Sequence, residues 1–405
     1  MKNRIVTIIG LFALLSTASA AGPKADFNVI PVPRTICAGT SAPFVLDSNT
    51  KIYYEEGQKR NAAFLQQYIT DITGIVPELT DRPRKRGTIS LRVKDTSSDA
   101  EGYTLTVDKK NIHIVGNSPA GVFYAIQTLR KALPAGQASE VEIPSCIVED
   151  SPRFAYRGVH LDVVRHFFPV DSVKRYIDII ALHNVNRFHW HLTDDQGWRV
   201  EIKSRPRLTS VGAYRKQTAG DGTPHGGFYT QDEIRDIIRY AQERYITIIP
   251  EIDIPGHSAA ALASYPEIGC TGGPYEVCEV WGGPADVLCA GKDETMQFLQ
   301  DVFTEIAGLF PSQYIHIGGD ECPKQRWKEC RACQAKIREL GIVPDKKHSA
   351  EQKLQSYVMV SVEKFLAAKG RKVIGWDEIL EGGLGPDATV HSWRGMGGAV
   401  EAVKQ

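Results

Sequence analysis

The sequence predicts an α/β fold of the TIM-type (β/α)8 barrel class, preceded by a small α+β domain. Two observations predict the barrel. From residue 153 onward a strand, a loop and a helix alternate repeatedly, which implies parallel strands joined by right-handed crossovers. Nearly every expected strand in this region ends in acidic residues. Polar residues at the carboxyl ends of successive strands are typical of a barrel, whereas a doubly wound sheet gathers them at one switch point.

The barrel elements follow from the spacing of apolar residues. Asp171 is the expected N-cap of the first helix, and a capping box from Thr230 to Glu233 is expected to open the second. Only six strands are predicted where a complete barrel has eight, so we expect the barrel, residues 151–405, to be truncated before its last two strands. The expected strands are 157–163, 186–195, 246–257, 314–321, 373–378 and 389–393, and the expected helices are 171–184, 230–244, 293–310 and 349–369.

Residues 21–150 show a different pattern, which is typical of a small α+β domain. Three segments alternate apolar and polar residues with period two, which predicts strands with one buried face. Ser118 and Pro119 then open a helical pattern. The boundary to the barrel is expected near Asp150. The three strands are expected at 88–94, 102–108 and 111–116.

Residues 1–20 are predicted to be a signal peptide. Lys2 and Arg4 precede an apolar run over residues 5–15, and small residues then end at Ala20 in an A-x-A cleavage pattern. We therefore expect cleavage near Ala20 and an exported chain, periplasmic or extracellular. The apolar run is shorter than the ~20 residues that span a bilayer, and no later stretch approaches that length, so no transmembrane anchor is expected in the mature chain.

The composition excludes several classes of protein. Lys+Arg and Asp+Glu both number 48, and this zero net charge argues against a nucleic-acid-binding protein, which would carry a basic excess. Hydrophobic residues at 42% and charged residues at 24% are ordinary for a globular protein and exclude wholesale disorder. No glycine-rich phosphate-binding motif follows any expected strand, so nucleotide binding has no support.

The eight cysteines are interpreted through the expected export. Cys330 and Cys333 form a CxxC motif, but a second CxxC is missing, so the sequence does not support a four-thiolate zinc site. In an oxidising compartment we expect disulfides Cys270–Cys289 and Cys330–Cys333. The cysteines expected to stay free are Cys37, Cys146 and Cys322.

Carboxylates and tryptophans near the strand ends together indicate a carbohydrate site. Indole rings stack on the apolar faces of sugars, and carboxylates serve the hydroxyls and a breaking glycosidic bond. Asp320 and Glu321 directly follow Gly318 and Gly319. Because neighbours in a regular strand face opposite ways, we expect the two glycines to bend the backbone and turn both acids toward one cleft. The tryptophans at or near strand ends are Trp190, Trp198, Trp376 and Trp393.

Six separated motifs carry a resemblance to a known family. They are RGVHLDVVRHFF, NRFHWHLTDDQGWR, PEIDIPGH, HIGGDE, GWDE and HSWRG. On these motifs the chain resembles the family-20 glycoside hydrolases, the exo-β-N-acetylhexosaminidases, and especially their exported bacterial members. The resemblance implies hydrolysis of terminal non-reducing β-linked N-acetylhexosamine, GlcNAc or GalNAc, from glycoconjugates by a substrate-assisted retaining mechanism. Glu321 would be the general acid/base, and Asp320 would orient the substrate's 2-acetamido group, which is the nucleophile.

The resemblance also implies how the terminal sugar is bound. Arg165 would grip its hydroxyls, with Asp194 as the supporting carboxylate. No cofactor and no metal are implied, and the expected partners are glycans that end in N-acetylhexosamine. The family's later motifs are missing, so we expect either a fragment of a longer chain or a site that has lost part of its residues. The remaining implied substrate-binding residues are Asp253 and His257 beside the acid pair and Trp376 and Trp393 in the wall around the N-acetyl group.

Two alternatives come from other classes of function. His189 and His191 form an H-x-H on one strand face, which could belong to a metal-dependent barrel hydrolase. Both histidines lie several residues before the strand end at Asp194, so we expect them to fill the polar interior of the barrel instead. The second alternative is a catalytically inactive fragment that still binds sugar.

Overall fold

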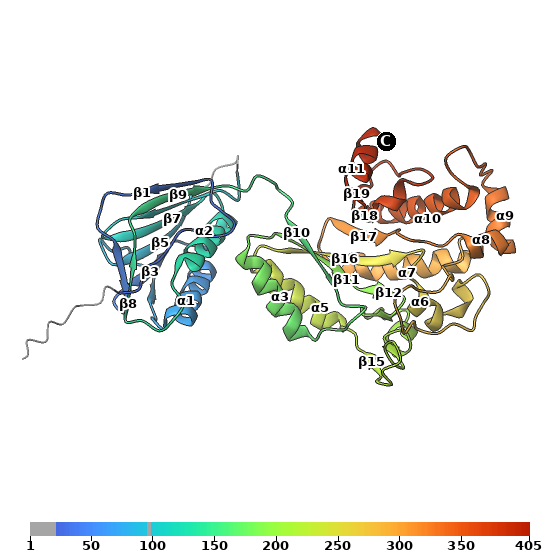
Figure 1. The fold of residues 1–405 in the computed structure, drawn as a ribbon, viewed down its shortest axis with the longest axis horizontal. Helices are drawn as coiled ribbons and strands as arrows, with labels where there is room; N and C mark the ends of the chain where they lie inside the picture. The colour runs from blue at the N-terminus through green and yellow to red at the C-terminus, as the bar shows by residue number, and fades with distance from the viewer. Residues whose placement is uncertain (1–21, 95–98) are drawn as a thin grey trace, which may run out of the picture. The chain divides into compact units, whose positions relative to one another are not determined.

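The structure is a computed structural model that describes residues 22–94 and 99–405 and divides into two compact units, Met1–Pro152 and Arg153–Gln405 (Figure 1). The predicted signal peptide, with its cleavage near Ala20, lies outside the described residues. Within the described ranges, no helix is both long enough and apolar enough to cross a membrane.

The first unit is a sheet covered by helices. Its main sheet has the order β1-β9-β6-β7-β5-β3-β4, and β2 pairs with β8 separately. The strands expected at 88–94, 102–108 and 111–116 are confirmed as β5, β6 and β7, and Ser118 caps the helix α2 by accepting hydrogen bonds from the next turn. The elements are β1 Thr35–Ala38, β2 Phe44–Asp47, β3 Lys51–Tyr54, α1 Lys59–Thr73, β4 Glu78–Thr80, β5 Thr88–Val93, β6 Tyr103–Val107, β7 Asn111–Gly116, α2 Pro119–Ala132, β8 Glu140–Ile143 and β9 Cys146–Asp150.

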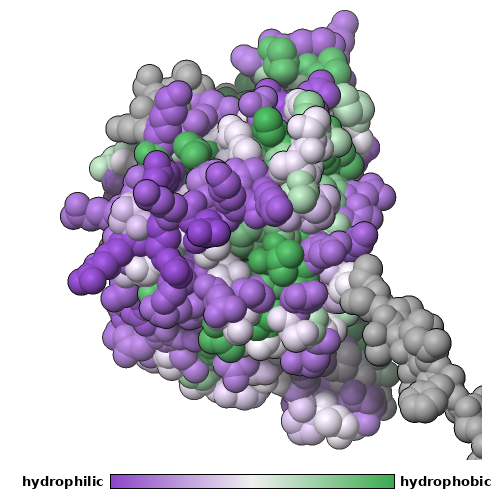
Figure 2. Space-filling model, turned by 90° about the vertical axis from the view of Figure 1, so that its left-hand side faces the viewer, coloured by the Kyte–Doolittle hydropathy of each residue, from purple (hydrophilic) through white to green (hydrophobic). Residues whose placement is uncertain are grey.

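Hydrophilic residues cover most of one face of the structure (Figure 2). Figure 2 shows a face on which hydrophilic residues dominate and hydrophobic residues form small, separate groups. The exposed apolar side chains of the first unit include Ile36, Val45 and Val76. Single exposed apolar residues are normal on globular proteins and need no partner.

The second unit is built on six parallel strands. They are hydrogen-bonded in chain order, β10-β11-β16-β17-β18-β19, so all six expected strands are confirmed, and with them the TIM-type α/β fold. Because parallel strands in chain order all point the same way, their carboxyl ends meet at one edge. The strands are β10 Gly158–Asp162, β11 Arg187–His191, β16 Thr247–Ile254, β17 Tyr314–Gly318, β18 Lys372–Trp376 and β19 Thr389–His391.

Four longer helices connect these strands. The capping box from Thr230 to Glu233 is confirmed at the start of α5, which buries Ile234 and Ile237. Asp171 is not the N-cap of α3 as expected, because that helix already begins at Val170 after Pro169 and Asp171 lies in its first turn. The four are α3 Val170–Leu182, α5 Gln231–Gln242, α7 Asp293–Leu309 and α10 Ala350–Ala367.

Shorter elements lie in the loops between the strands and helices. The loop elements matter for function because they surround the carboxyl ends of the barrel strands (Figure 1). They are β12 Thr193–Asp194, β13 Gly197–Trp198, α4 Arg207–Ser210, β14 Tyr214–Arg215, β15 His225–Gly226, α6 Ala259–Ser264, η1 Pro266–Ile268, α8 Gln325–Glu329, α9 Arg331–Glu339, η2 Asp377–Leu380 and α11 Met396–Lys404.

Candidate active site

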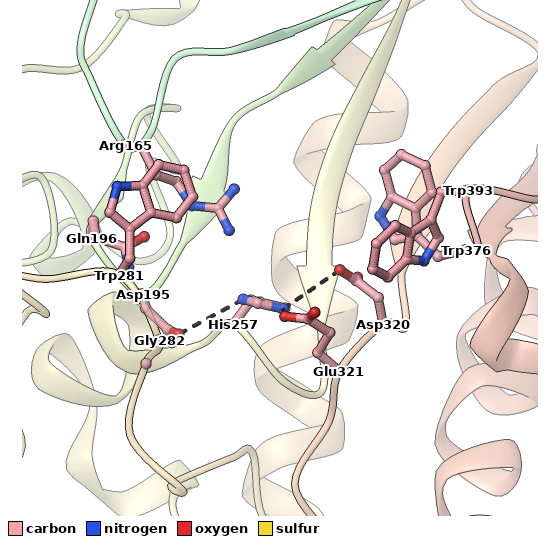
Figure 3. A pocket seen from close by; sticks show the side chains of 11 residues that line it. Arg165, Asp195, Gln196, His257, Trp281, Gly282, Asp320, Glu321, Trp376 and Trp393 are labelled. Atoms are coloured by element: carbon pink, nitrogen blue, oxygen red, sulfur yellow. Dashed lines mark ion pairs between the residues drawn. The ribbon is translucent and has the colours of Figure 1, made fainter. Parts of the chain in front are cut away.

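A cavity of about 380 Å³ lies at the carboxyl ends of the barrel strands in the second unit. Carboxylates, a histidine and an arginine share its lining with three tryptophans, which is the combination of polar groups and flat apolar faces that a sugar ring needs. Figure 3 shows these side chains converging from different loops. The lining residues are Arg165, Asp195, Gln196, His257, Trp281, Gly282, Gly283, Asp320, Glu321, Trp376 and Trp393.

A glycine turn at the end of β17 brings Asp320 and Glu321 to the cavity. Gly318 and Gly319 have φ angles of 64° and 102°, which glycine adopts freely. A Cβ atom on Gly318 would lie 1.6 Å from Asp253 Oδ1, so only glycine fits there. The expected backbone bend is therefore confirmed, and both acids of the pair line the same cavity.

Asp320, in the cavity lining, and the buried Asp253 behind it form a carboxyl pair. Asp253 Oδ1 accepts a hydrogen bond of 3.1 Å from the backbone N–H of Gly319, while Asp253 Oδ2 and Asp320 Oδ1 have no donor among the described groups. Burial, with Asp320 close by, raises the pKa of Asp253 well above its usual value, and burial also raises the pKa of Asp320. Burial therefore favours the protonated form of each acid, and of the two only Asp320 lines the cavity.

His257 lies between Asp194 on one side and the acid pair Asp320 and Glu321 on the other. Its Nδ1 donates to Asp194 Oδ1 at 3.0 Å, and its Nε2 lies 3.5 Å from Asp320 Oδ2 and 3.7 Å from Glu321 Oε2 (Figure 3). Burial alone would lower the pKa of His257, but the hydrogen bonds to Asp194 and Asp195 outweigh it and hold the pKa far above its usual value. The side chain is thus an imidazolium at neutral pH, facing both acids of the pair.

Arg165 and Asp194 form an ion pair on the other side of the cavity. Arg165 Nη2 lies 2.6 Å from Asp194 Oδ2, and its Nη1 donates to Asp162 Oδ2 at 2.9 Å. Burial would raise the pKa of Asp194, but hydrogen bonds from His191 and His257 hold it below its usual value. The guanidinium is therefore fixed by carboxylates and presents its remaining edge to the cavity.

Aromatic side chains form two opposite walls. Trp376, the last residue of β18, donates from Nε1 to Glu251 Oε1 at 2.9 Å, and Trp393 donates from Nε1 to Glu378 Oε2 at 3.0 Å. These hydrogen bonds hold both rings in place. Across the cavity, the ring of Trp281 stacks on Arg165, whose Cζ lies 5.0 Å from the ring centroid (Figure 3).

The residues that line the cavity differ in part from those expected from the sequence. Trp281 was not expected in the site, because it lies in a Gly/Pro-rich loop without the periodic pattern of a strand or helix. Asp195 could have been found as the neighbour of Asp194. Trp190 and Trp198, both expected in a carbohydrate site, are buried packing residues outside the cavity, and Trp198 donates to the carbonyl of Val200.

The H-x-H pair fills the barrel interior, as expected. His189 Nε2 and His191 Nδ1 bind the same oxygen of Glu251, at 2.8 and 2.5 Å, and both imidazoles are buried. His189 also comes within metal-binding reach of His316 and His391, yet none of these histidines lines the cavity. The H-x-H pair therefore offers no metal ligands to this cavity.

The cysteines differ from the expectation. All eight lie within the described residues, and all are free thiols, so the expected disulfides Cys270–Cys289 and Cys330–Cys333 are not formed, whereas Cys37, Cys146 and Cys322 are free as expected. The four cysteines of the expected pairs lie together in one cluster instead.

Comparisons with known proteins agree with this geometry. The family model "Glycosyl hydrolase family 20, catalytic domain" matches residues 154–405, and "Glycosyl hydrolase family 20, domain 2" matches residues 26–151. A beta-hexosaminidase of Porphyromonas gingivalis is 44% identical over 93% of this chain, and one of Vibrio furnissii is 36% identical over 95%. The chain spans 48% and 62% of the lengths of these two curated relatives.

Solved structures of similar proteins have the same fold. A Streptomyces plicatus beta-hexosaminidase variant in complex with product (GlcNAc) superposes with a TM-score of 0.80 at 33% identity, covering 93% of this chain and 71% of that one. An exo beta-N-acetylglucosaminidase of Vibrio harveyi in complex with N-acetylglucosamine superposes with a TM-score of 0.83 at 33% identity, covering 95% and 60%. With both family models matched in order along nearly the whole described chain, the protein belongs to glycosyl hydrolase family 20.

Proposed function

We propose that the protein hydrolyses terminal non-reducing β-linked N-acetylhexosamine residues of glycoconjugates by a substrate-assisted, retaining mechanism. One observation carries the proposal: the adjacent Asp320 and Glu321 both reach one cavity, and Asp320 faces the tryptophan wall (Figure 3). That arrangement separates the two jobs of the reaction, because one acid can hold the acetamido group while its neighbour handles the leaving oxygen.

In the first step the glycosidic bond breaks. Glu321, whose side chain is 60% exposed at the cavity mouth, donates a proton to the leaving oxygen. The carbonyl oxygen of the substrate's own acetamido group attacks C1 and forms a bond to it as the bond from C1 to the leaving oxygen breaks. The positive charge that develops on the acetamido nitrogen is stabilised by the ionised Asp320, which accepts a hydrogen bond from its N–H.

In the second step water opens the cyclic oxazolinium intermediate. The Glu321 carboxylate takes a proton from a water molecule as its oxygen attacks C1, and the C1–O bond to the acetamido oxygen breaks. Two inversions at C1 give net retention of the β configuration. The acetamido group and the proton on Glu321 are both regenerated, so the site is ready for another turnover.

The other lining residues would position the sugar. Arg165, held by Asp194 and Asp162, offers a rigid set of donors for sugar hydroxyls. Trp376 and Trp393 would enclose the N-acetyl group. The relatives support this assignment, because the Streptomyces plicatus and Vibrio harveyi proteins were solved with GlcNAc and N-acetylglucosamine.

The proposal is tested by comparing two aryl glycosides. We expect the aryl β-N-acetylglucosaminide to be hydrolysed at least about 100-fold faster than the matching aryl β-glucoside, because only the first carries an intramolecular nucleophile. NMR of the first product should show the β anomer. Comparable rates on the two sugars would overturn the substrate-assisted mechanism, and binding of N-acetylglucosamine without any turnover would favour the sugar-binding alternative.

We also propose that the chain is exported to the periplasm or beyond, with its leader removed near Ala20. The support is the charged start, the apolar run and the A-x-A pattern of residues 1–20. N-terminal sequencing of the protein recovered from the producing cells should begin at Ala21, and recovery of an intact Met1 would contradict the proposal.

A further inference from the structure

Four cysteine side chains form a cluster in the second unit. Cys270 and Cys289 come from the loop between α6 and α7, and Cys330 and Cys333 flank the start of α9. All four Sγ atoms lie within 4.8 Å of one another, and Cys289 and Cys333 are fully buried. The cluster joins segments that are about sixty residues apart in the chain, so tertiary folding alone creates it.

The sulfur separations fit a metal site and not a pair of disulfides. Cys289 Sγ lies 3.6 Å from Cys333 Sγ and 3.7 Å from Cys330 Sγ, and Cys270 Sγ lies 3.9 Å from Cys333 Sγ. A disulfide requires about 2.05 Å. In a tetrahedron of four thiolates with zinc–sulfur bonds of about 2.3 Å, neighbouring sulfurs are about 3.8 Å apart, which is the spacing found here.

The backbone around the cluster is built for close approach. A Cβ atom on Gly291 would lie 2.2 Å from the carbonyl carbon of Ala332, so a glycine is needed where the two cysteine-bearing segments touch. The backbone N–H of Gly291 also points at Cys289 Sγ. Backbone N–H groups stabilise a thiolate, and the position of Cys330 and Cys333 at the N-terminus of α9 adds the positive end of a helix dipole.

We propose that Cys270, Cys289, Cys330 and Cys333 bind one Zn²⁺ in a closed, tetrahedral structural site. Four soft thiolates in this geometry select zinc and leave no coordination position for a substrate or water. Binding releases the thiol protons, so the metal adds to the folding free energy of the loops that carry the ligands. The proposal does not depend on the activity proposed above.

The site would support the pocket from outside. The loop between Cys270 and Cys289 carries Trp281, Gly282 and Gly283, which line the cavity. Trp327, in the segment that leads from the acid pair to Cys330, donates from Nε1 to the carbonyl of Leu288, next to Cys289. Zinc would therefore fasten the Trp281 wall to the segment that follows Asp320 and Glu321.

The first experiment measures metal and thiols in the full chain purified without reductant or chelator. We expect elemental mass spectrometry to find one zinc per chain. Native mass spectrometry should give a protein mass that exceeds the denatured mass by the mass of one zinc ion. Four thiols should resist alkylation until a mercurial or a strong chelator releases the metal. The protein should also keep its zinc in a buffer of reduced and oxidised glutathione set to the redox potential of the secretory pathway.

A variant set separates the site from general effects of losing a cysteine. Cys333→Ser should lose zinc, lower the Tm and speed proteolytic cleavage within residues 270–289. Cys278→Ser is the matched control, because Cys278 lies in the same loop but outside the cluster, and it should keep one zinc per chain. Gly291→Ala should weaken zinc retention during titration with a chelator by forcing the two segments apart.

Three results would overturn the proposal. A denatured mass lower by the mass of four hydrogen atoms, with no metal, would show two disulfides. Iron in place of zinc would contradict the choice of metal. Stoichiometric zinc that survives in Cys333→Ser would place the metal elsewhere, for example at the histidines around Glu251. If Cys333→Ser fails to fold, metal release from the unmodified chain with a Tm measurement decides the question.

Discussion

The barrel interior and the barrel mouth both combine carboxylates with histidines, but the two clusters are built differently. In the interior, Glu251 is fully buried and both its oxygens are occupied, by His189 and His191 on one side and by His316 and Trp376 on the other. At the mouth, Asp320 in the cavity lining and Asp253 buried behind it each keep an oxygen without a donor among the described groups.

This difference separates structural from functional acids. Burial would raise the pKa of Glu251, but the charge on His191 and the hydrogen bonds outweigh that effect and hold the pKa well below its usual value. Glu251 is therefore an ionised carboxylate. At the mouth, the pKa values of Asp253 and Asp320 are raised because burial is not fully compensated. An incompletely satisfied carboxyl beside a cavity is ready to interact with a ligand, whereas a fully satisfied one supports the fold.

The largest effect is expected from removing the acid at the mouth. Glu321→Gln should lower kcat/KM on a natural glycan about 10²- to 10⁴-fold, because proton transfer to the leaving oxygen is lost. The loss should be smaller on an aryl glycoside with a good leaving group. Since the side chain is 60% exposed, the Tm should not change. Equal losses on both substrates would contradict the role as general acid.

The interior acid should give the opposite result. Glu251→Gln should lower the free energy of unfolding by about 3–5 kcal/mol, because it leaves the buried imidazolium of His191 without its nearest carboxylate. Urea unfolding of this variant beside Glu321→Gln measures the contrast. Unchanged stability in Glu251→Gln would break the distinction between the two clusters.

Asp320→Asn tests the second acid of the pair. We expect kcat on the aryl β-N-acetylglucosaminide to fall about 10²- to 10³-fold, because a neutral amide cannot stabilise the positive charge on the acetamido nitrogen. The rate on the aryl β-glucoside should hardly change, so the preference between the two sugars should shrink. An equal fall on both sugars would indicate a general disturbance of the site.

Asp253→Asn should stabilise the protein in a pH-dependent way. The pKa of Asp253 is higher in the folded chain than in the unfolded chain, where it is about 4. Its contribution to stability is therefore fully present when the pH is below the unfolded-state pKa, and it is lost as the pH rises through the folded-state pKa. Asparagine imitates the protonated carboxyl and cannot ionise. Its Tm advantage over the unmodified chain should therefore grow from pH 4 to pH 7, to roughly 2–4 °C for about 1 kcal/mol. A Tm gap that does not change with pH would contradict the raised pKa.

The smallest effect is expected at the aromatic wall. Trp393→Ala should raise KM about 2- to 10-fold with little change in kcat, because the half-exposed ring contributes stacking but no chemistry. Trp393→Phe should recover part of the affinity. A large fall in kcat would show that this wall also aligns the reacting groups.

Elements with a strong local pattern could be predicted from the sequence. The six barrel strands, the capping box of Thr230 and the glycine bend before Asp320 all rest on residues close together in the chain. Local chemistry decides each of these features. His189 and His191 are buried as expected, but the expected reason was wrong, because β11 ends at His191 itself and not near Asp194. Their hydrogen bonds to Glu251 hold them inside the barrel.

Features made by long-range packing could not be predicted. Trp281 reaches the cavity from a loop without periodicity, and only the fold brings it over Arg165. The cysteine cluster was missed because two of its members, Cys270 and Cys289, share no spacing rule with the CxxC motif at Cys330. Asp171 was taken for an N-cap because an acidic residue in the first turn has a similar preference.

The glycine turn also limits how this pocket could be redesigned. At Gly318 a side chain would collide with Asp253, and at Gly319 it would come within 2.5 Å of the Ile379 side chain, so mutant libraries should hold both positions constant. Trp281 is 73% exposed, so we expect a substitution there to disturb the fold far less. Altered selectivity for the sugar or its neighbour is therefore best sought by varying the Trp281 loop, while the backbone beneath the acid pair stays untouched.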